Sequence, residues 1–422
     1  MLLLVILVVL FIAVGIPIYI ALALPPLISI VLEGINPLVF VQRLFGGIDK
    51  FALMAIPFFI FAANLMGKGG MARRILVLAD TLVGHFYGGT AAGTVLSCLF
   101  FGALSGSAPA TVVAIGGITY PMLLENNYGK KFSMGLISSA SSLALLIPPS
   151  ITMIVYASST STSVGQLFMA GIGPGILLGL MLMGYSIWYA RKNNIRSTSE
   201  ITGRQLWLAF KDASWALGVP VIILGGIYAG VFTPTESATV AAAYAIFIGL
   251  FIYKGIDLKT LFETCVSSAL VTAQVMILCA AAAVLSWMLT ISQAQLFFLQ
   301  ILEPFLDSPF MILIIMNIIL FIFGMFIDPT PFVLLLAPLF APLAKHIGLD
   351  LIHLGVIMVL GGAIGMYTPP FGLNLFVGMS IFGEDYATVT KSVLPFIIIG
   401  VIAMLTVSFW PGLSLWLPHR LW

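Results

Sequence analysis

The chain has 422 residues, of which 61% are hydrophobic and 8% are charged, and its net charge is +2 and its mean hydropathy +1.17. A soluble domain is about half apolar and about a quarter charged, so this composition excludes a soluble protein and indicates a polytopic membrane protein. No segment is polar enough to form a soluble domain and no GxxxxGK[ST] motif occurs, so we expect no ATP site and no nucleic-acid partner. The three cysteines lie in apolar segments at spacings that suggest neither a disulfide nor a metal site.

The first candidate membrane span is Leu2–Leu24, an apolar run long enough to cross a hydrocarbon core of ~30 Å. It has neither a basic n-region nor a small-residue cleavage site before Pro25, so we do not expect a signal peptide. Runs of similar length follow at Ile172–Ala190, Trp215–Val231 and Val393–Trp410.

Two apolar stretches of the first half are interrupted by helix-breaking residues. The stretch 88–123 contains Ser105-Gly106-Ser107-Ala108-Pro109, and the stretch 132–157 contains Ile147-Pro148-Pro149-Ser150. Within lipid, non-helical backbone is tolerated only where protein covers it or where it lines a cavity. Because proline suits the first turn of a helix, each break is expected to end one half-helix and to begin another. We therefore predict a re-entrant helical hairpin over about 88–123 and a broken helix over about 132–157.

The longest polar stretch, 191–212, is predicted to be a cytoplasmic linker between two halves, residues 1–190 and 213–422. Cytoplasmic loops of membrane proteins carry an excess of lysine and arginine. This stretch contains five such residues: Arg191, Lys192, Arg196, Arg204 and Lys211.

The second half repeats the breaks of the first. Asp328-Pro329-Thr330-Pro331 interrupts the stretch 310–343, where we predict a second hairpin, and Thr368-Pro369-Pro370-Phe371 interrupts 351–383, where we predict a second broken helix. Several residues recur at offsets of 221 or 222: Phe101 and Phe323, Gly102 and Gly324, Pro109 and Pro331, Pro148 and Pro369, Pro149 and Pro370, Pro174 and Pro395, and Gly179 and Gly400. A repeat that keeps helix breakers in register is typical of transporters, whose sites form from discontinuous helices.

The distribution of charge predicts that the two halves have opposite orientations. With the linker in the cytoplasm and each hairpin entering and leaving on one side, 13 of the 17 Lys and Arg residues lie inside. The N-terminus then lies outside. The basic residues left outside are Arg43, Lys50, Lys345 and Arg420. The predicted fold class is therefore an all-α polytopic membrane protein with two inverted-topology repeats, each with one re-entrant hairpin and one broken helix.

The breaks also predict a binding chemistry. The C-terminal end of a half-helix presents free carbonyls with partial negative charge, and together with serine hydroxyls these form an oxygen-rich nest suited to Na⁺. The N-terminus of the following half-helix carries partial positive charge and suits an anionic substrate group. We therefore expect cation and anion sites at the breaks.

Asp328 is the most specific single candidate for a site residue, because it is an acidic residue within an apolar run and has no basic neighbour in sequence. A carboxylate within a membrane is by default a functional-site hypothesis, here a cation ligand. The alternative is an N-cap, since Pro329 suits the first helical position; both remain open. Asn374 and Thr152 lie near the two proline pairs, where they could face the site or serve packing between helices.

Other polar features are interpreted as structural. The small-residue runs Ser138-Ser139-Ala140-Ser141-Ser142 and Gly361-Gly362-Ala363 favour close helix packing. Thr233 and Glu236 have the spacing of a capping box that begins a helix. The histidines and the C-terminal tryptophans are expected at the membrane interface: His85, His346, His353, His419, Trp410, Trp416 and Trp422.

The sequence resembles the large membrane subunit of tripartite ATP-independent periplasmic (TRAP) transporters and looks most like the sialic-acid branch. The segments that carry the resemblance keep the family's order: Ala55-Ile56-Pro57-Phe58-Phe59, Gly102 to Pro109, Ile147-Pro148-Pro149-Ser150, Phe232-Thr233-Pro234-Thr235-Glu236 and Thr368-Pro369-Pro370-Phe371-Gly372. The resemblance implies an elevator-type secondary transporter of the bacterial inner membrane, with a scaffold domain and a moving transport domain. It also implies Na⁺ coupling without another cofactor, a small four-helix membrane partner subunit, a periplasmic solute-binding protein and an organic-anion substrate such as a carboxylate or sialic acid.

Site residues are carried over from the family by position. A first sodium site would use Ser105, Gly106, Ser107, Ile147, Pro148 and Pro149. A second would use Asp328, Thr330, Gly365 and Thr368. The anion would lie between the hairpin tips, near Ala108, Pro109, Ser150, Thr152, Pro331, Pro370 and Asn374.

Three other functions remain open at this point. The first is a stand-alone Na⁺/anion symporter that needs no binding protein. The second is an intramembrane serine hydrolase built on Ser105, although the sequence offers no evident histidine partner. The third is a channel, against which hairpins entering from opposite faces argue.

Overall fold

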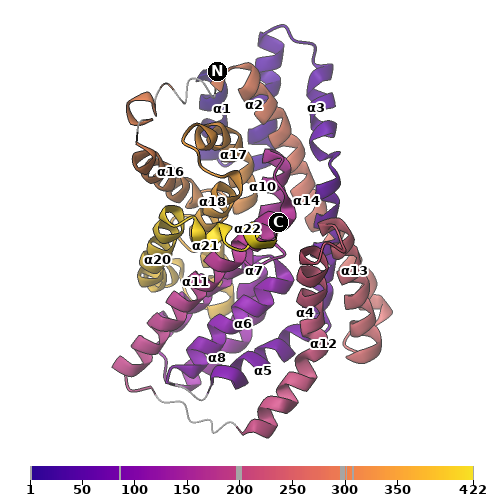
Figure 1. The fold of residues 1–422 in the computed structure, drawn as a ribbon, viewed down its shortest axis with the longest axis vertical. Helices are drawn as coiled ribbons and strands as arrows, with labels where there is room; N and C mark the ends of the chain where they lie inside the picture. Colours follow the sequence, from indigo (N-terminus) through magenta and orange to yellow (C-terminus); the bar gives the residue numbers. More distant parts are fainter. Residues whose placement is uncertain are drawn as a thin grey trace.

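The computed structural model describes residues 2–84, 87–195, 202–294, 300, 302–306 and 308–421. All regular structure in these residues is helical (Figure 1). Three residues of the sequence predictions, His85, Arg196 and Trp422, lie outside them.

The elements that precede the linker include two short 3₁₀ segments, η1 and η3, and one π-helical segment, η2. In chain order they are α1 (Leu2–Ala13), α2 (Ile18–Leu32), α3 (Leu38–Ile48), η1 (Phe51–Met54), α4 (Ala55–Lys68), α5 (Met71–Val83), α6 (Gly89–Ser105), α7 (Ala108–Thr111), η2 (Val112–Gly116), α8 (Gly117–Glu125), α9 (Lys130–Ala140), η3 (Ser141–Leu145), α10 (Ile151–Thr160) and α11 (Val164–Lys192).

The elements that follow the linker include a π-helical segment, η4, and a 3₁₀ segment, η5. They are α12 (Gly203–Tyr228), α13 (Pro234–Phe247), η4 (Ile248–Ile252), α14 (Leu258–Ile291), η5 (Glu303–Phe305), α16 (Pro309–Gly324), α17 (Pro329–His346), α18 (Leu351–Gly365), α19 (Leu373–Phe382), α20 (Tyr386–Phe409), α21 (Gly412–Leu415) and α22 (Pro418–Leu421).

Within the described ranges, seven helices are long and apolar enough to cross a membrane. They are Phe51–Lys68, Ala108–Glu125, Val164–Lys192, Gly203–Tyr228, Pro234–Ile252, Leu258–Ile291 and Tyr386–Phe409. Apolar helices of 10–17 residues accompany them, among them α6, α10, α16, α18 and α19. These five flank the breaks, so the interrupting residues are what keep them short.

The helices are interrupted at each of the four segments that the sequence singled out. Helix α6 stops at Ser105 before α7 begins, and η3 stops at Leu145 before α10 begins. In the second half α16 stops at Gly324 before α17, and α18 stops at Gly365 before α19. The Pro148–Pro149 and Pro369–Pro370 peptide bonds are both cis.

The prediction of one N-terminal span over Leu2–Leu24 is wrong. The run is divided between α1 and α2, because Gly15 takes a left-handed conformation with φ of +82° and Pro17 stands at the N-cap of α2. A left-handed glycine ends a helix at little cost, and proline cannot continue one.

The predicted linker, 191–212, ends earlier in the structure than the sequence indicated. Helix α12 begins at Gly203, because Thr202 and Gln205 form a capping box in which the Thr202 amide donates to Gln205 Oε1 at 2.9 Å. The polar residues that follow are helical: Asp212 accepts from Arg74 Nε at 3.1 Å, which ties α12 to α5.

The prediction that His353 lies at the membrane interface is also wrong. His353 is fully buried in the first turn of α18, where its Nε2 lies 3.3 Å from the Ser408 carbonyl of α20. Ser408 Oγ in turn donates to Asn317 Oδ1 of α16 at 2.9 Å. The Ser408 carbonyl therefore serves Nε2, whereas Nδ1 is buried without a hydrogen-bond partner. His346 and His419 are exposed.

The predicted capping box at α13 is confirmed. Thr233 is the N-cap with Pro234 at N1, the Thr233 hydroxyl accepts from the Glu236 amide, and the Glu236 carboxylate accepts from the Thr233 amide at 2.8 Å. Glu236 therefore serves the start of a helix.

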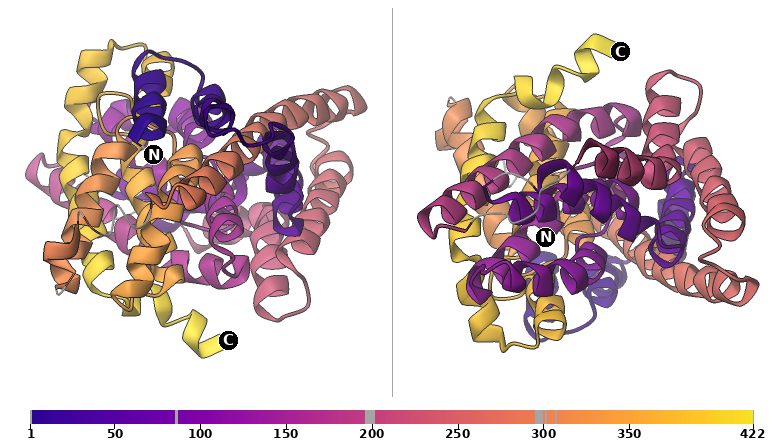
Figure 2. Two further views of the ribbon diagram at one scale, coloured as in Figure 1. Left: turned by 90° about the horizontal axis from the view of Figure 1, so that it is seen from above. Right: turned by 90° about the horizontal axis from the view of Figure 1, so that it is seen from below.

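The helices gather into two groups. Helices α2, α3 and α4 pack with α13 and α14, and α12 packs on α13. In Figure 2, α3, α12 and α13 lie on one side of the molecule, and α14 runs from that side to α17 of the orange helices. The interrupted helices and the long helices α11 and α20 form the other group. We call these the flanking group and the central group.

The central group contains contacts that occur twice with the halves exchanged. Helix α10 packs on α17, whereas α19 packs on α7 and η2. Helix α11 packs on α18, whereas α20 packs on α9. The helix that follows each proline pair thus packs on the helix that follows the other half's first break.

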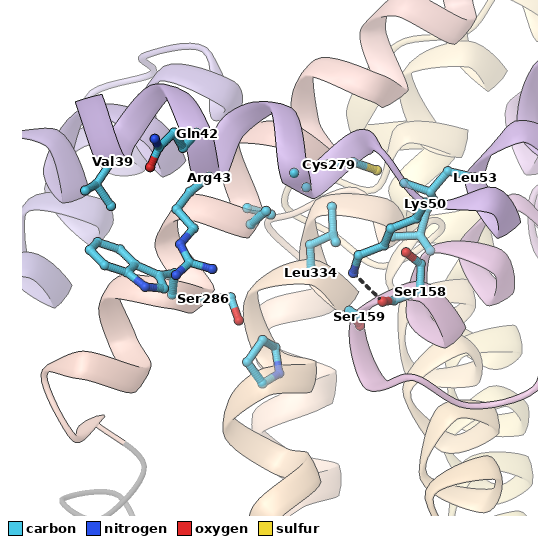
Figure 3. Close-up of a pocket in the computed structure, with 17 residues that line it drawn as sticks. Val39, Gln42, Arg43, Lys50, Leu53, Ser158, Ser159, Cys279, Ser286 and Leu334 are labelled. Carbon is cyan, nitrogen blue, oxygen red and sulfur yellow. Dashed lines mark hydrogen bonds between the residues drawn. The ribbon is translucent and has the colours of Figure 1, made fainter. Parts of the chain in front are cut away.

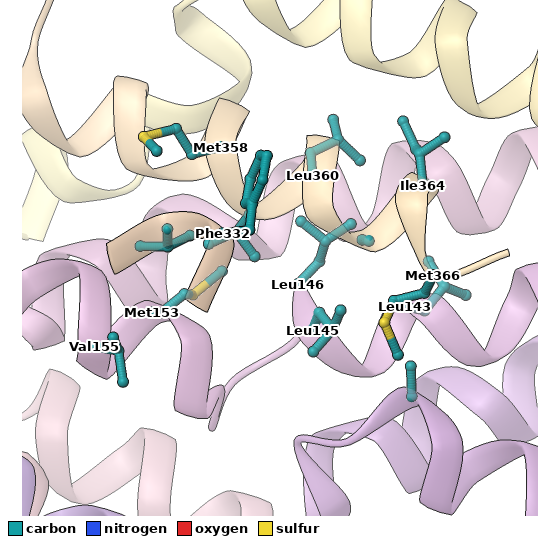
Figure 4. Close-up of a cluster of buried hydrophobic side chains, with 14 of the residues drawn as sticks. Leu143, Leu145, Leu146, Met153, Val155, Phe332, Met358, Leu360, Ile364 and Met366 are labelled. Carbon is teal, nitrogen blue, oxygen red and sulfur yellow. The ribbon is translucent and has the colours of Figure 1, made fainter. Parts of the chain in front are cut away.

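An apolar cluster joins the breaks of both halves. Its members come from η3, α10, α17 and α18 and from the residues just beyond η3 and α18: Leu143, Leu145, Leu146, Met153, Val155, Phe332, Met358, Leu360, Ile364 and Met366 (Figure 4). Each is at most 5% exposed. Because side chains of both halves interdigitate here, the four breaks are held in one body.

Candidate functional site

The first tip, Ser105-Gly106-Ser107, forms a compact cluster of oxygens. The Ser105 hydroxyl lies 3.1 Å from Thr111 Oγ1 and 3.3 Å from the Ser107 carbonyl. Thr111 Oγ1 donates to the same carbonyl at 2.8 Å. Ser105 and Thr111 are both buried. Sequence reasoning missed Thr111, although its position four residues after Ser107 places it one helical turn inside the tip.

The first tip lies against the first proline pair. Gly106 has φ of +58°, and a Cβ placed on it would be 2.7 Å from the Pro149 carbonyl oxygen. A Cβ on Gly102 would be 2.7 Å from the Ala144 Cα. Glycine is therefore required for the tip to approach η3 and Pro149, and this approach brings Ser105, Gly106, Ser107 and Pro149 together.

The two serines at the first pair of breaks cap their half-helices. Ser107 accepts from the Ala110 amide at 3.5 Å, and Ser150 accepts from the Met153 amide at 3.4 Å. Both bonds are long, so the hydroxyls stay only weakly engaged. Ala108 and Pro109 form the first turn of α7, and Thr152, which is 1% exposed, lies in the first turn of α10.

The second tip packs on the second broken helix in the same manner. The Phe371 amide donates to the Met325 carbonyl at 3.1 Å. A Cβ on Gly365 would overlap the Gly324 carbonyl, and one on Gly362 would be 3.1 Å from Pro329 Cβ. The ends of α16 and α18 therefore meet with backbone against backbone, beside the start of α17.

Thr330 and Thr368 are buried at this second pair of breaks. The Thr368 hydroxyl donates back to the Ile364 carbonyl at 2.7 Å, and its amide donates to the Gly365 carbonyl at 3.0 Å. Pro370 lies beside it in the break, and its carbonyl accepts from Tyr386 Oη at 2.7 Å.

Asp328 occupies the N-cap position of α17, but its carboxylate makes no capping hydrogen bond. A capping side chain accepts from the amide at N2 or N3. Here N3 is Pro331, which has no N–H. Among the described residues the carboxylate has no hydrogen bond or ion pair, so it remains available to another partner.

Asn374 bridges the two halves. It is fully buried, and its Nδ2 donates to the Ser138 carbonyl at 2.8 Å. Its Oδ1 and the Ser138 hydroxyl have no hydrogen-bond partner. The other serines of the Ser138–Ser142 run donate to carbonyls of their own helix. Just before the run, α9 packs closely on α20, for a Cβ on Gly135 would overlap the Ser392 carbonyl.

A cavity of about 640 Å³ lies between the two groups of helices, outside the breaks. Helices α3 and α14 form one wall, and α10 and α17 form the other (Figure 3). Arg43 and Lys50, two of the basic residues that the charge pattern left outside, project into it. Sequence reasoning assigned them no site, because neither is near a break in the sequence.

The chain matches the family model described as "Tripartite ATP-independent periplasmic transporter, DctM component" over residues 4–413. It is 41% identical to the C4-dicarboxylate TRAP transporter large permease protein DctM of Pseudomonas aeruginosa, covering 90% of this chain and 89% of that protein. It is 39% identical to the ectoine/5-hydroxyectoine TRAP transporter large permease protein UehC of Ruegeria pomeroyi, with 89% and 88% covered.

A third relative is longer than this chain. The isethionate TRAP transporter permease protein DctMQ of Oleidesulfovibrio alaskensis is 40% identical over 410 residues, which cover 96% of this chain and 64% of that protein.

Solved structures share the fold at low sequence identity. The YdaH transporter of Alcanivorax borkumensis superposes with a TM-score of 0.61 at 15% identity, over 89% of this chain and 88% of that one. MtrF of Neisseria gonorrhoeae gives a TM-score of 0.59 at 11% identity, over 89% and 83%.

The family consists of transporter permeases and not of enzymes, so the hypothesis of a serine hydrolase built on Ser105 is rejected. The match runs through both tips and both proline pairs. The chain belongs to the DctM-component family of TRAP transporters and is a multi-pass protein of the bacterial inner membrane.

Proposed function

We propose that the chain is the Na⁺-coupled membrane subunit of a TRAP transporter, which imports an organic anion by an elevator movement. The observation that carries the proposal is the chemistry at the paired breaks. The first tip gathers hydroxyl and carbonyl oxygens. The second tip presents the carboxylate of Asp328, which makes no capping hydrogen bond. Hydroxyl, carbonyl and carboxylate oxygens are the ligands of hard cations, and such cations bind at unwound helix ends in transporters.

Two unequal sodium sites follow from this chemistry. The first uses oxygens of Ser105, Ser107 and Thr111 with the carbonyls of the Ile147–Pro149 segment around Gly106. The second uses Asp328, Thr330, Gly365 and Thr368. Only the second contains a full negative charge, so we expect it to bind Na⁺ more tightly.

The duplicated contacts of the central group support two inverted-topology repeats, residues 1–190 and the second half after the linker. In each half the end of the broken helix packs on the other half's hairpin. A binding body built in this way can move as a unit past a fixed scaffold. We assign the scaffold to the flanking group and the transport domain to the central group.

The anion is proposed to bind between the tips. There the first turns of α7, α10 and α17 offer partial positive charge beside Ala108, Pro109, Ser150, Thr152, Pro331, Pro370 and Asn374. Relatives of this chain are named for C4-dicarboxylate, isethionate and ectoine transport. We therefore propose a small carboxylate or sulfonate substrate. The resemblance to the sialic-acid branch finds no support in those names.

Two partners complete the proposed transporter, a small membrane subunit and a periplasmic solute-binding protein that delivers the anion. The family name and the large-permease names of the relatives support this assignment.

The test is uptake of radiolabelled succinate or isethionate into proteoliposomes that hold the chain with the small subunit and binding protein encoded beside it. Uptake should require an inward Na⁺ gradient and should stop when an ionophore collapses it. Uptake that persists without the gradient contradicts Na⁺ coupling. Equal uptake after the binding protein is left out favours the stand-alone symporter.

A further inference from the structure

The cavity between α3 and α14 on one side and α10 and α17 on the other has the size and the polarity of a small-ligand site. Its volume of about 640 Å³ falls in the range typical of ligand pockets. The polar side chains that line it are Gln42, Arg43, Lys50, Ser158, Ser159 and Ser286. None of the lining residues that the structure describes is acidic.

The first basic side chain of this cavity is Arg43 of α3. Its guanidinium carbon lies 5.2 Å from the ring centroid of Trp287, and the guanidinium points toward Ser286 of α14, on the same side of the cavity (Figure 3). The ion pairs found among the described residues, Arg74–Asp212 and Lys130–Glu384, do not involve it. A guanidinium packed on an indole keeps a planar set of N–H donors that matches a carboxylate or sulfonate.

Lys50 brings a second positive charge from the turn between α3 and η1. Its Nζ donates to the Ser158 carbonyl at 2.7 Å, in the last turns of α10. An ammonium has three donors, so this bond leaves two for a ligand. Desolvation lowers the pKa of Lys50, and an anion beside it would favour the charged form.

We propose that this cavity is an anion site, in which Arg43 and Lys50 hold the carboxylate or sulfonate group of an organic anion at the boundary between the flanking and central groups. The inference rests on the proposed function, because it names where the anion is held before it reaches the tips. Leu334 lines the cavity six residues after Asp328, or about 9 Å along α17. The anion would bind the two donors of Lys50 that the Ser158 carbonyl leaves free, so it would lie beside the direct contact between the two groups.

The electrostatic test uses Ser286→Cys as a reporter in a chain with Cys265→Ala and Cys279→Ala, reconstituted in zwitterionic phosphatidylcholine. The measured quantity is the ratio of modification rates by an anionic sulfonatoethyl and a cationic trimethylammonioethyl thiosulfonate reagent. The ratio should fall about tenfold in Arg43→Gln and in Lys50→Gln, because each removes a cavity charge. Lys345→Gln, a basic residue outside the cavity, should leave it unchanged, and an uncharged reagent should modify all variants equally.

Succinate or isethionate should slow modification of the reporter, and this protection should be lost in both glutamine variants. Protection that survives in both overturns the proposal. The proposal is also overturned if succinate and isethionate give no protection and modification of the reporter slows only when phosphatidylglycerol is added to the membrane. A lipid headgroup would then be the occupant of the cavity.

A steric variant gives an independent result. Gly46 lines the cavity on α3, and a Cβ added there meets no atom within 4 Å. Gly46→Leu should fill the cavity and abolish protection by succinate. Gly184→Leu, at an equally open position on α11, should retain it. Full protection in Gly46→Leu counts against the site.

Modification and protection need no transport. Protection that depends on Arg43 and Lys50 supports the anion site even if uptake proves independent of Na⁺. Na⁺-driven uptake that is unchanged in both glutamine variants, together with unchanged protection, removes the site and leaves the proposed function standing.

Discussion

The four half-helices that begin at the breaks are capped in different ways. Ser107 and Ser150 accept from the amide at N3, and Gly372 has no side chain to cap with. Asp328 stands at the same position but faces Pro331 at N3, so its carboxylate is left unused. Pro331 removes one of the two amides that an N-cap side chain can bind, and the carboxylate does not bind the other, the Thr330 amide, so Asp328 is left as a candidate ion ligand.

Replacing this carboxylate should weaken the response to Na⁺. In Asp328→Asn the side chain keeps its shape but loses the negative charge, so the Na⁺ concentration for half-maximal uptake should rise about tenfold or more. The measurement is uptake into proteoliposomes over a series of Na⁺ concentrations.

The matched control for this variant is Asp257→Asn. Asp257 caps α14 by accepting from the Thr260 amide at 2.7 Å, and asparagine caps equally well. It should leave the Na⁺ dependence unchanged. An unaltered apparent Na⁺ affinity in Asp328→Asn would remove Asp328 as a ligand.

Gly106 is required for two independent reasons, its left-handed φ of +58° and the nearby Pro149 carbonyl. Gly106→Ala should lower the free energy of unfolding by about 1–2 kcal/mol from the backbone alone. The contact at 2.7 Å adds to this cost. Thermal unfolding in detergent should show a reduced transition temperature.

Gly184→Ala provides the comparison, because a Cβ at this position in α11 meets no atom within 4 Å. Alanine in a helix interior is favoured over glycine by about 1 kcal/mol, so this variant should be as stable as the parent or more so. Equal stability of both variants would contradict the argument for Gly106.

At the scale of single elements, the start of α13 shows how a membrane helix is delimited by local chemistry. Pro234 takes the position that needs no N–H, and Thr233 and Glu236 satisfy each other's amides. The carboxylate of Glu236 is exposed, and its Oε2 accepts from both the amide and the hydroxyl of Thr233 at 2.8 Å. At the start of α13 the acidic residue Glu236 therefore takes part in capping the helix, whereas at the start of α17 the acidic residue Asp328 makes no capping hydrogen bond.

Removing this capping box should destabilise the protein without altering its ion dependence. Thr233→Ala should cost about 1 kcal/mol of stability, measured by thermal unfolding. Thr239→Ala, which removes an exposed hydroxyl bonded within α13, should have a smaller effect. A shift in Na⁺ affinity in Thr233→Ala would show that this turn does more than begin a helix.

At the scale of the whole molecule, the chain combines a group of interrupted helices with a group of flanking helices. The interrupted helices are locked together by the shared apolar cluster (Figure 4) and by the Asn374–Ser138 hydrogen bond between halves. Packing at the boundary with the flanking group is less continuous, because the cavity lined by Arg43 and Lys50 occupies part of this boundary (Figure 3). A less tightly packed boundary is where one body can slide past another.

Joining the two groups covalently should therefore stop transport. In a chain without native cysteines, Ser286→Cys on α14 and Leu334→Cys on α17 line opposite walls of the cavity. A reducible bifunctional thiol reagent should abolish uptake through this pair, and reduction should restore it.

The control pair is Asn64→Cys with Ser268→Cys. Asn64 Nδ2 and Ser268 Oγ lie 2.9 Å apart, and both residues belong to the flanking group. Bridging them should leave uptake intact, because no movement within that group is proposed. Continued uptake through the bridged Ser286–Leu334 pair would contradict the elevator movement.

The sequence by itself determined the membrane class, the four breaks and the capping box at α13, because each depends on composition or on residues a few positions apart. The reason why Asp328 does not cap was also local, since Pro331 lies three residues away. The end of the linker was misplaced although its cause is also local, the capping box of Thr202 and Gln205. Only the contact between Asp212 and Arg74, which joins residues 138 apart, depends on the tertiary structure.

Only the tertiary structure decided which breaks lie together, that Thr111 completes the first oxygen cluster, and that Arg43 and Lys50 face one cavity. The Lys50–Ser158 bond spans 108 residues and the Asn374–Ser138 bond spans 236. Helix ends follow from local backbone chemistry, whereas a site built from several helices depends on how their side chains pack. The pattern of one amino-acid sequence does not show which distant helix surfaces contact each other.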